Sequence, residues 1–454
     1  MDIKSSYGSE LNIEILSKKE RFSLGEFINI GLVVMLCISA NFFDIQIGIP
    51  YLSPPILLSV LLTCISFLRQ LRNGRVLAFD KTVSLWIYLI ILSMALSSIP
   101  TIIGGLDVTK VFTQMARMST GIMTAWAVAY SFEKVDLGIK ALVTGFSLAG
   151  LVSGAIGLMQ WIDFNVLHRV PFYITPTVPT YQLAAANGAY TAMGSLVYRI
   201  SGAYGEPSWF GLYTSLLLMV SLGFLFGGAI EIGKNLKKLL SISAIVMFLT
   251  LIISRSLTGI GLAVIANMIT AILFIPLRRS RPILHRVLLL LIVAAVVGGT
   301  ILYVVFTHGY LAQRIPKILD LTDPSVVQRL GTFKQAIQLW SYSPFIGIGV
   351  GQYSLAEVKY LSNYIDVSID SGWLLVLAET GLFGFLSYFG FLFYLCRKLF
   401  KHYTRSAFVM GSVIVYLFIE LISLNDTYSV FIWILIGFSI LLLRTNNSLS
   451  EGGV

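Results

Sequence analysis

Residues Val287–Val305 read V-L-L-L-L-I-V-A-A-V-V-G-G-T-I-L-Y-V-V, and Phe431–Leu443 read F-I-W-I-L-I-G-F-S-I-L-L-L. Neither stretch alternates apolar with polar residues, as the strands of a membrane β-barrel do. Similar apolar runs recur along the chain, each bounded by charged or Gly- and Pro-rich breaks, and most are long enough to cross a bilayer as a helix. These runs predict an all-α polytopic membrane protein.

The composition supports this prediction, because the 454 residues are 56% hydrophobic and only 12% charged, whereas soluble domains carry roughly 25% charged residues. We expect a single transmembrane domain over 26–443, between tails at 1–25 and 444–454. About twelve helices are predicted in it, at 26–46, 51–69, 82–102, 108–132, 138–160, 207–228, 238–254, 257–277, 286–306, 372–396, 406–424 and 428–443.

The distribution of basic residues predicts the orientation. Most of the 32 Lys and Arg residues fall in the two tails and in the connections after every second helix, which puts both termini in the cytoplasm. The segment Met1–Phe22 has no apolar core followed by a cleavage site, so we expect no removable signal peptide. Because these charges are spread over short loops, the net charge of +10 indicates membrane topology and no nucleic-acid partner.

Two long connections, about 161–206 and 307–371, then lie outside the cytoplasmic membrane. No ATP is available there, so an enzyme must use a substrate that carries its own activation. Gly347, Gly349 and Gly351 resemble a phosphate-binding loop, but that function needs a βαβ unit, and flexible re-entry of the loop is the favoured interpretation. The three Cys and four His residues lack ligand-like spacing, so we expect no disulfide and no metal.

The segment Arg199–Ser208, R-I-S-G-A-Y-G-E-P-S, ends a polar stretch and opens an apolar helix. Charges at a membrane mouth are costly unless they are solvated, paired or used, so Arg199 and Glu206 indicate a functional site. Pro207 favours a helix start, whose dipole would keep Glu206 ionised and able to accept a proton. A capping carboxylate paired with Arg199 explains the same pattern, and both roles are compatible.

The second outer loop contains a predicted helix that starts at Asp323-Pro324. Its apolar residues follow helical spacing and predict a face that lies on the membrane domain or in the interface: Val326, Leu330, Phe333, Ile337 and Trp340. Arg329 lies off the centre of this stripe, where it is either a solvated charge beside its helix or a functional residue.

Two further polar features fall at predicted helix ends. The turn Ser254–Gly259, with Arg255, would suit a phosphate oxygen through hydroxyls, backbone N–H groups and a guanidinium, and a plain turn between helices is an equal alternative. Glu379 lies about two turns into the helix 372–396, where a hydrogen bond between helices is favoured over catalysis.

Together, these motifs resemble the O-antigen polymerase and O-antigen ligase superfamily. The residues that carry the resemblance, over about 190–390, are Arg199-x-x-Gly202 with Glu206-Pro207-Ser208, Ser254-x-Ser256-x-Thr258-Gly259, Arg329 ahead of Pro344-x-x-Gly347-x-Gly349, and Ser371-Gly-Trp-Leu-Leu-x-x-x-Ala-Glu379-Thr-Gly381-Leu-Phe-Gly384. Within the superfamily, a Wzy-type polysaccharide polymerase with a GT-C-like helical fold is favoured.

The resemblance implies a metal-independent glycosyltransferase without a cofactor, on the outer face of the bacterial cytoplasmic membrane. Its donor would be a growing glycan on undecaprenyl pyrophosphate, and its acceptor another lipid-linked repeat unit of O-antigen, capsule or exopolysaccharide. A chain-length regulator and a flippase are possible partners. The alternatives are an O-antigen ligase acting on lipid A-core in lipopolysaccharide assembly, a lipid-linked oligosaccharide flippase, and a non-enzymatic partner of the assembly complex.

The resemblance also assigns roles to single residues. Arg199 and Arg329 match the superfamily arginines that hold the pyrophosphate, and Arg255 and Arg314 are weaker candidates for the same role. The ligases carry a histidine at the head of the span after the large loop, where this chain has Asp370-Ser371. This difference favours the polymerase, with Asp370 or Glu206 as the general base.

Overall fold

The computed structural model describes residues 23–42, 53–74, 78–169, 190–192, 195–197, 199–204, 206–227, 233–254, 256–274, 317, 319–361, 369–402 and 404–444. The first half contains α1 (Leu24–Ser39), which continues in the 3-10 turn η2 (Ala40–Phe42), α2 (Pro54–Arg72), α3 (Lys81–Ile103), α4 (Val108–Tyr130) and α5 (Val135–Asn165). After the antiparallel hairpin of β1 (Tyr190–Ala192) and β2 (Ser195–Val197) follow α7 (Pro207–Gly227), α8 (Lys234–Ser254) and α9 (Leu257–Phe274). The last part contains α12 (Pro324–Tyr342), α13 (Tyr353–Tyr360), α14 (Gly372–Lys401), α15 (Arg405–Glu420) and α16 (Val430–Leu443).

The helices confirm a polytopic membrane protein. Seven of those described are long and apolar enough to cross a bilayer, namely α2, α3, α5, α8 and α14 together with Leu24–Phe42 and Pro207–Phe226. The stretches 258–270 and 430–443 are shorter apolar helices. Every predicted span overlaps a described helix except 286–306, which lies outside the described residues. The only departure from an all-helical fold in the described part of the chain is the short hairpin in the first long connection.

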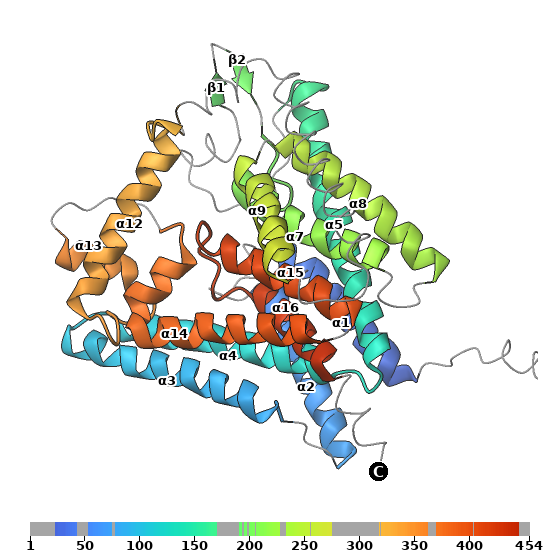
Figure 1. Ribbon diagram of the computed structural model, residues 1–454, viewed down its shortest axis with the longest axis horizontal. Helices are drawn as coiled ribbons and strands as arrows, with labels where there is room; N and C mark the ends of the chain where they lie inside the picture. The colour runs from blue at the N-terminus through green and yellow to red at the C-terminus, as the bar shows by residue number, and fades with distance from the viewer. Residues whose placement is uncertain are drawn as a thin grey trace, which may run out of the picture.

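The helix α16 forms the centre of the molecule (Figure 1), with neighbouring helices on all sides. Its residues from Val430 to Leu442 are buried, as expected for a helix that is apolar all round. The backbones of α4 and α16 approach closely, because a Cβ added to Gly121 would overlap Trp433 and one added to Gly437 would overlap Ala125. Small residues at such crossings allow close helix packing in membrane proteins.

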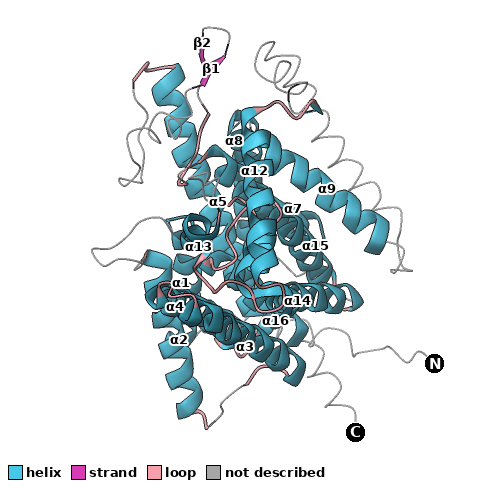
Figure 2. Cartoon of the chain, turned by 90° about the vertical axis from the view of Figure 1, so that its left-hand side faces the viewer, coloured by secondary structure: helices cyan, strands magenta, loops and turns pink. Residues whose placement is uncertain are grey.

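The helices α3, α4 and α14 run side by side, and α12 stands across their ends (Figure 1). Figure 2 shows α12 upright in front of the other helices with α13 beside it, so the two views agree. The predicted start of α12 is confirmed, because the Asp323 carbonyl accepts hydrogen bonds from the N–H groups of Val326 and Val327 at 2.9 and 3.0 Å. The helices α12, α13 and α14 share a second, smaller apolar core.

Of the two positions predicted for the apolar face of α12, packing on the membrane domain is contradicted for Leu330 and Ile337. Leu330 and Ile337 of the predicted stripe are 48% and 44% exposed, whereas the buried side of the helix is lined by Thr332, Gln335, Ala336 and Leu339. On the buried side, Ala336 and Leu339 pack in the second apolar core with residues of α13 and α14. Contact of this outward face with the membrane interface stays a prediction.

A break in α14 anchors the second long connection. Gly381 has φ 65° and ψ −169° inside the helix, and the loop before α13 lies against this break. Ile348 and Gly349 donate N–H hydrogen bonds to the carbonyls of Ala378 and Glu379, both at 3.0 Å, while Leu382 donates to the Pro344 carbonyl at 2.8 Å. The loop therefore supplies partners for the backbone groups that the helix break leaves open.

Candidate functional site

The site begins with a buried connection between the hairpin and α7. Residues 199–204 are all buried, and one side chain of α5 satisfies their backbone. The Gln160 amide oxygen accepts hydrogen bonds from the N–H groups of Ser201 and Gly202 at 3.0 and 2.9 Å, and its nitrogen donates to the Gly202 carbonyl at 2.9 Å. Tyr204 donates a hydrogen bond to Asn41. These bonds fix the segment that carries Arg199.

Arg199 connects this segment to the turn between α8 and α9. Its side chain is 8% exposed, and Nε donates to the Ser254 carbonyl at 3.2 Å. Two of the motifs that the sequence analysis singled out, Arg199-x-x-Gly202 and Ser254–Gly259, therefore meet in space. The guanidinium is held at the point where α8 ends.

The turn itself is packed tightly. Ser254 and Ser256 are buried, and the Ser256 hydroxyl accepts from the Gly259 N–H at 3.3 Å, which caps the start of α9. A Cβ added to Gly211 of α7 would overlap Ser256. The sequence analysis left two interpretations of this turn, a phosphate site and a plain turn between helices. The plain turn explains the hydroxyls of Ser254 and Ser256, because they form hydrogen bonds within the turn and have no exposed surface for a phosphate. Arg255 and Arg314 lie outside the described residues.

Glu206 lies at the start of α7 and is exposed. Among the described residues, its carboxylate accepts a hydrogen bond from Ser208 at 3.1 Å and has no ion pair with Arg199. The ion pair between Glu206 and Arg199 that the sequence allowed is therefore absent from the described structure. The exposed Glu206 carboxylate is accessible to a ligand at the start of α7.

Arg329 and Asp370 form an ion pair. Arg329 lies on α12 and Asp370 directly precedes α14, where Ser371 caps the helix by accepting from the Leu374 N–H at 3.3 Å. Arg329 Nε is 3.5 Å from Asp370 Oδ2, and the two side chains are 29% and 40% exposed. Burial raises the pKa of Asp370, and the neighbouring Arg329 guanidinium partly opposes this rise.

The end of α15 contacts both parts of the site. The Tyr416 hydroxyl donates to the Leu212 carbonyl of α7 at 3.0 Å. The segment after α15 contacts the start of α14, where Gly372 and Trp373 donate N–H hydrogen bonds to the carbonyls of Leu424 and Leu421 at 3.0 and 3.2 Å. The helix α15 and the segment after it therefore contact both α7 and the start of α14. The sequence analysis singled out no residue of this helix.

Glu379 has the predicted role of a hydrogen bond between elements. Its side chain is 2% exposed and accepts from the Tyr353 N–H and the Tyr428 hydroxyl, both at 3.3 Å. We expected the loop with Gly347 and Gly349 to re-enter flexibly. In the structure it packs closely against α14 and α3. Gly347 and Gly349 have φ values of 75° and 114°, and their close approach to Glu379 and Thr101 leaves no room for a Cβ.

The described residues contain no group of three or more His, Cys, Asp or Glu residues that could hold a metal ion. The arrangement consists of arginines, exposed or half-buried carboxylates, and helix ends that hold them. Guanidinium groups bind phosphate oxygens through paired hydrogen bonds, and a carboxylate of raised pKa can accept a proton near neutral pH. Each arginine can bind a phosphate oxygen, and Asp370, beside Arg329, can remove a proton from a nucleophile. Among the described residues, the contact of Arg199 with Ser254 and that of Arg329 with Asp370 are separate.

Comparison with models of known protein families matches residues 242–389 to the family described as O-Antigen ligase. This range includes the Ser254–Gly259 turn, Arg329, the glycine loop and Asp370, whereas Arg199 and Glu206 precede it. The resemblance to the O-antigen polymerase and ligase superfamily is thereby confirmed. A search of curated proteins finds no match. The family match indicates a polymerase-type or ligase-type function and does not distinguish the two.

Proposed function

Starting from the match of residues 242–389 to the O-antigen ligase family, we propose that the chain is a Wzy-type polysaccharide polymerase. It transfers a growing glycan from undecaprenyl pyrophosphate to a hydroxyl group of another lipid-linked repeat unit. A glycosidic bond forms, the bond to the pyrophosphate breaks, and undecaprenyl pyrophosphate leaves. The observation that carries the proposal is the half-buried Arg329–Asp370 pair at the start of α14, where the ligases of the superfamily carry a histidine.

In this mechanism Arg329 binds the pyrophosphate, because a guanidinium offers bidentate hydrogen bonds to phosphate oxygens. The leaving group is already stabilised by its own charge distribution and by the arginines, so no separate strong acid is needed. Arg199 is the second pyrophosphate ligand, held through Ser254. Arg255 and Arg314 are weaker candidates for the same role.

Asp370 is the general base that takes the proton from the acceptor hydroxyl. In the absence of substrate it faces Arg329 at 3.5 Å, which lowers its basicity. Arg329 lowers the pKa of Asp370, and a pyrophosphate bound to Arg329 competes for this guanidinium, so we expect the pKa of Asp370 to rise when the donor is in place. Glu206, exposed at the start of α7, is the alternative base.

The proposed topology has twelve spans with both termini in the cytoplasm of a bacterial inner membrane. The substrates then reach the site from the outer side, through the bilayer that holds their lipid carrier. Helices α12 and α13, which lie across the ends of α3 and α14 (Figure 1), would face this side. A chain-length regulator and a flippase are the proposed partners.

The test is complementation of a strain that lacks this protein, with Arg199→Ala, Glu206→Ala, Arg329→Ala or Asp370→Ala. Lys334→Ala is the matched control, because Lys334 is an exposed cation of the same helix as Arg329. We expect Arg199→Ala, Arg329→Ala and Asp370→Ala to accumulate single repeat units on the lipid carrier at normal membrane levels of protein, while the control makes normal polymer. Normal polymer from all four variants would contradict the proposal.

An O-antigen ligase is the second candidate, favoured by the description of the matching family. A ligase attaches finished polymer to its final acceptor, so its loss leaves the polymer length unchanged. Long polymer that stays on the lipid carrier in the deletion strain would support the ligase and exclude the polymerase. Accumulated single repeat units support the polymerase.

A further inference from the structure

Arg329 and Asp370 belong to different elements, so the distance between them depends on how α12 is placed against α14. Arg329 lies in the second turn of α12, and Asp370 directly precedes α14. Both side chains are partly exposed, and ion pairs that water reaches hold two elements together only weakly. Another contact between α12 and α14 must therefore keep the guanidinium beside the carboxylate.

Tyr353, the first residue of α13, is hydrogen-bonded to both of these elements. Its N–H donates to the Glu379 carboxylate of α14 at 3.3 Å, and its hydroxyl donates to the Thr332 carbonyl of α12, also at 3.3 Å. The residue is 5% exposed, so water competes little for these bonds. Tyr353 therefore spans the distance between the two helices.

The bond to α12 lies beside Arg329. Thr332 follows Arg329 by three residues, and its hydroxyl donates to the Arg329 carbonyl at 3.0 Å. Residues three apart are neighbours on one face of a helix. A bond that fixes the backbone of Thr332 therefore also fixes the turn of α12 from which the Arg329 side chain projects.

The bond to α14 ends on a carboxylate that is itself fixed. Glu379 is 2% exposed and also accepts a hydrogen bond from the Tyr428 hydroxyl at 3.3 Å. Ile369, the neighbour of Asp370 in the chain, packs in the same small apolar core as Tyr353. The start of α13 is therefore tied to the part of α14 that follows Asp370.

We propose that Tyr353 is a positioning residue, which holds the Arg329 guanidinium beside the Asp370 carboxylate by linking α12 to α14. This inference rests on the proposed function, since it names what sets the geometry of the same site. Tyr353 touches no substrate and exchanges no proton or bond. Its hydroxyl also lies beside the Glu357 carboxylate, but Glu357 is one turn further along α13, so that contact stays within one element.

The experiment replaces the Asp370 carboxylate with a thiol and measures the reactivity of that thiol. In the full-length protein without its three native cysteines, Asp370→Cys puts a thiol at a position whose side chain is 40% exposed. The thiolate is the form that reacts with iodoacetamide, and a neighbouring cation favours the thiolate. The alkylation rate, at a fixed pH below the pKa of the thiol, therefore reports how closely Arg329 is held, and it requires neither substrate nor catalysis.

Two variants break the link at its two ends. Tyr353→Phe removes the hydroxyl and keeps the ring in the apolar core. Glu379→Gln weakens the bond to α14, because an amide oxygen accepts the Tyr353 N–H less strongly than a carboxylate does. The matched control is Tyr416→Phe, which removes another buried tyrosine hydroxyl that donates to a backbone carbonyl, that of Leu212 at 3.0 Å.

Arg329→Gln should slow the alkylation about tenfold or more, because an arginine beside an acidic group favours the charged form by a factor of this order. Tyr353→Phe should slow it about threefold, as a partial loss of the same influence. Glu379→Gln should also slow it, although the loss of a negative charge would by itself favour the thiolate. In the Arg329→Gln background, Tyr353→Phe should have no further effect. Tyr416→Phe should react at the normal rate.

An unchanged alkylation rate in Tyr353→Phe would overturn the inference, and so would an unchanged rate in Glu379→Gln if Tyr353→Phe does not fold. Equal slowing by Tyr353→Phe with and without Arg329 would overturn it too, because the hydroxyl would then act by a route that does not involve the guanidinium. No effect of Arg329→Gln would have the same consequence.

The two proposals fail separately in these experiments. Normal polymer from the four variants of the complementation test would remove the proposed function and leave the alkylation rates as evidence of the link between α12 and α14. Unchanged alkylation in the variants of the link would remove the role of Tyr353 alone.

Discussion

Asp370 and Arg329 show how the surroundings of single residues define their chemistry. Either charge alone, in an outer loop, would be an ordinary solvated group. In the structure each is partly buried by α12 and α14, and the two lie 3.5 Å apart. Burial raises the pKa of Asp370 and Arg329 lowers it. A ligand that binds the Arg329 guanidinium should therefore change the pKa of Asp370.

The first prediction concerns the pH dependence of transfer. Activity requires the ionised carboxylate, so it should rise as the pH increases through the pKa of Asp370, which burial places above the usual range of aspartate. Arg329→Gln removes the influence that lowers this pKa, and the acid limb of the profile should therefore move to higher pH. The rate at the optimum should fall about tenfold or more, because a charge-assisted hydrogen bond contributes about 1.5–3 kcal/mol.

The measurement is single-turnover transfer by purified protein at a donor concentration below saturation, over a pH series that extends to both sides of the acid limb, because the limb then reports the enzyme without bound donor. Lys334→Gln serves as the control and should leave the limb in place. An acid limb that moves to lower pH in Arg329→Gln would exclude Asp370 as the base.

A second prediction concerns Gln160, which is 1% exposed and makes three hydrogen bonds to the segment of Arg199. Gln160→Leu leaves two buried N–H groups and one carbonyl without partners, and should lower the free energy of unfolding by about 2–4 kcal/mol. Thermal unfolding in detergent measures this loss. Gln160→Glu can still accept both N–H bonds and should lose less, and equal losses in the two variants would contradict the assigned bonds.

At the scale of elements, the break in α14 explains why the glycine loop has its sequence. Gly381 has a positive φ and lies so close to Phe345 that a Cβ would overlap its backbone. The loop in turn donates hydrogen bonds to the carbonyls before the break. The break and the loop therefore depend on each other, and together they hold α12 and α13 over the start of α14.

The third prediction tests this dependence. Gly381→Ala should destabilise the protein by about 3 kcal/mol or more, because the backbone conformation and the contact with Phe345 both exclude a side chain. Gly261→Ala in α9 is the matched control, since nothing lies within 4 Å of its added Cβ, and it should stabilise by about 0.5–1 kcal/mol. The fraction of protein that stays monodisperse after heating reports both effects. Equal stability of the two variants would show that the break is not required.

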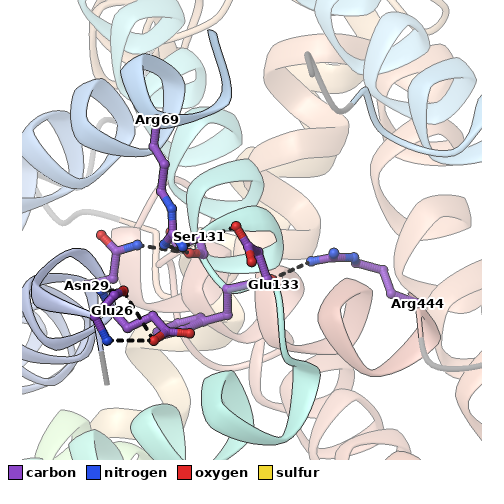
Figure 3. Close-up of polar contacts among 8 residues, drawn as sticks. Glu26, Asn29, Arg69, Ser131, Glu133 and Arg444 are labelled. Carbon is purple, nitrogen blue, oxygen red and sulfur yellow. Dashed lines mark hydrogen bonds and ion pairs between the residues drawn. The ribbon is translucent and has the colours of Figure 1, made fainter. Parts of the chain in front are cut away.

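At the scale of the whole molecule, the end opposite the site is held by a polar cluster around the turn between α4 and α5. Figure 3 shows Asn29, Arg69 and Arg444 converging on this turn from separate parts of the chain. Asn29 and Arg69 donate to the Ser131 carbonyl at 2.8 and 3.4 Å, Arg69 pairs with Glu133 at 3.2 Å, and Arg444 donates to the Phe132 carbonyl at 3.4 Å. The basic residues at this end agree with a cytoplasmic position.

The fourth prediction tests the orientation by thiol labelling. In a variant without its three cysteines, Ser354→Cys on α13 and Lys401→Cys at the end of α14 each introduce one exposed thiol. A small reagent that does not cross the cytoplasmic membrane should label Ser354→Cys in intact cells, and Lys401→Cys only after the membrane is opened. The reverse pattern would place the site in the cytoplasm and contradict the proposed chemistry.

The sequence by itself determined the helical membrane class, the start of α12 at Asp323 and the resemblance to the superfamily, because apolar run length, helix caps and motif order are local properties of the chain. Only the tertiary structure decided the partners of the candidate residues. Arg199 meets Ser254 from 55 positions away, and Tyr353 links α12 to α14 through Thr332 and Glu379. Local patterns cannot determine such pairings, because they depend on which faces of distant helices pack together. This is also why the sequence could not choose between the two positions predicted for the apolar face of α12.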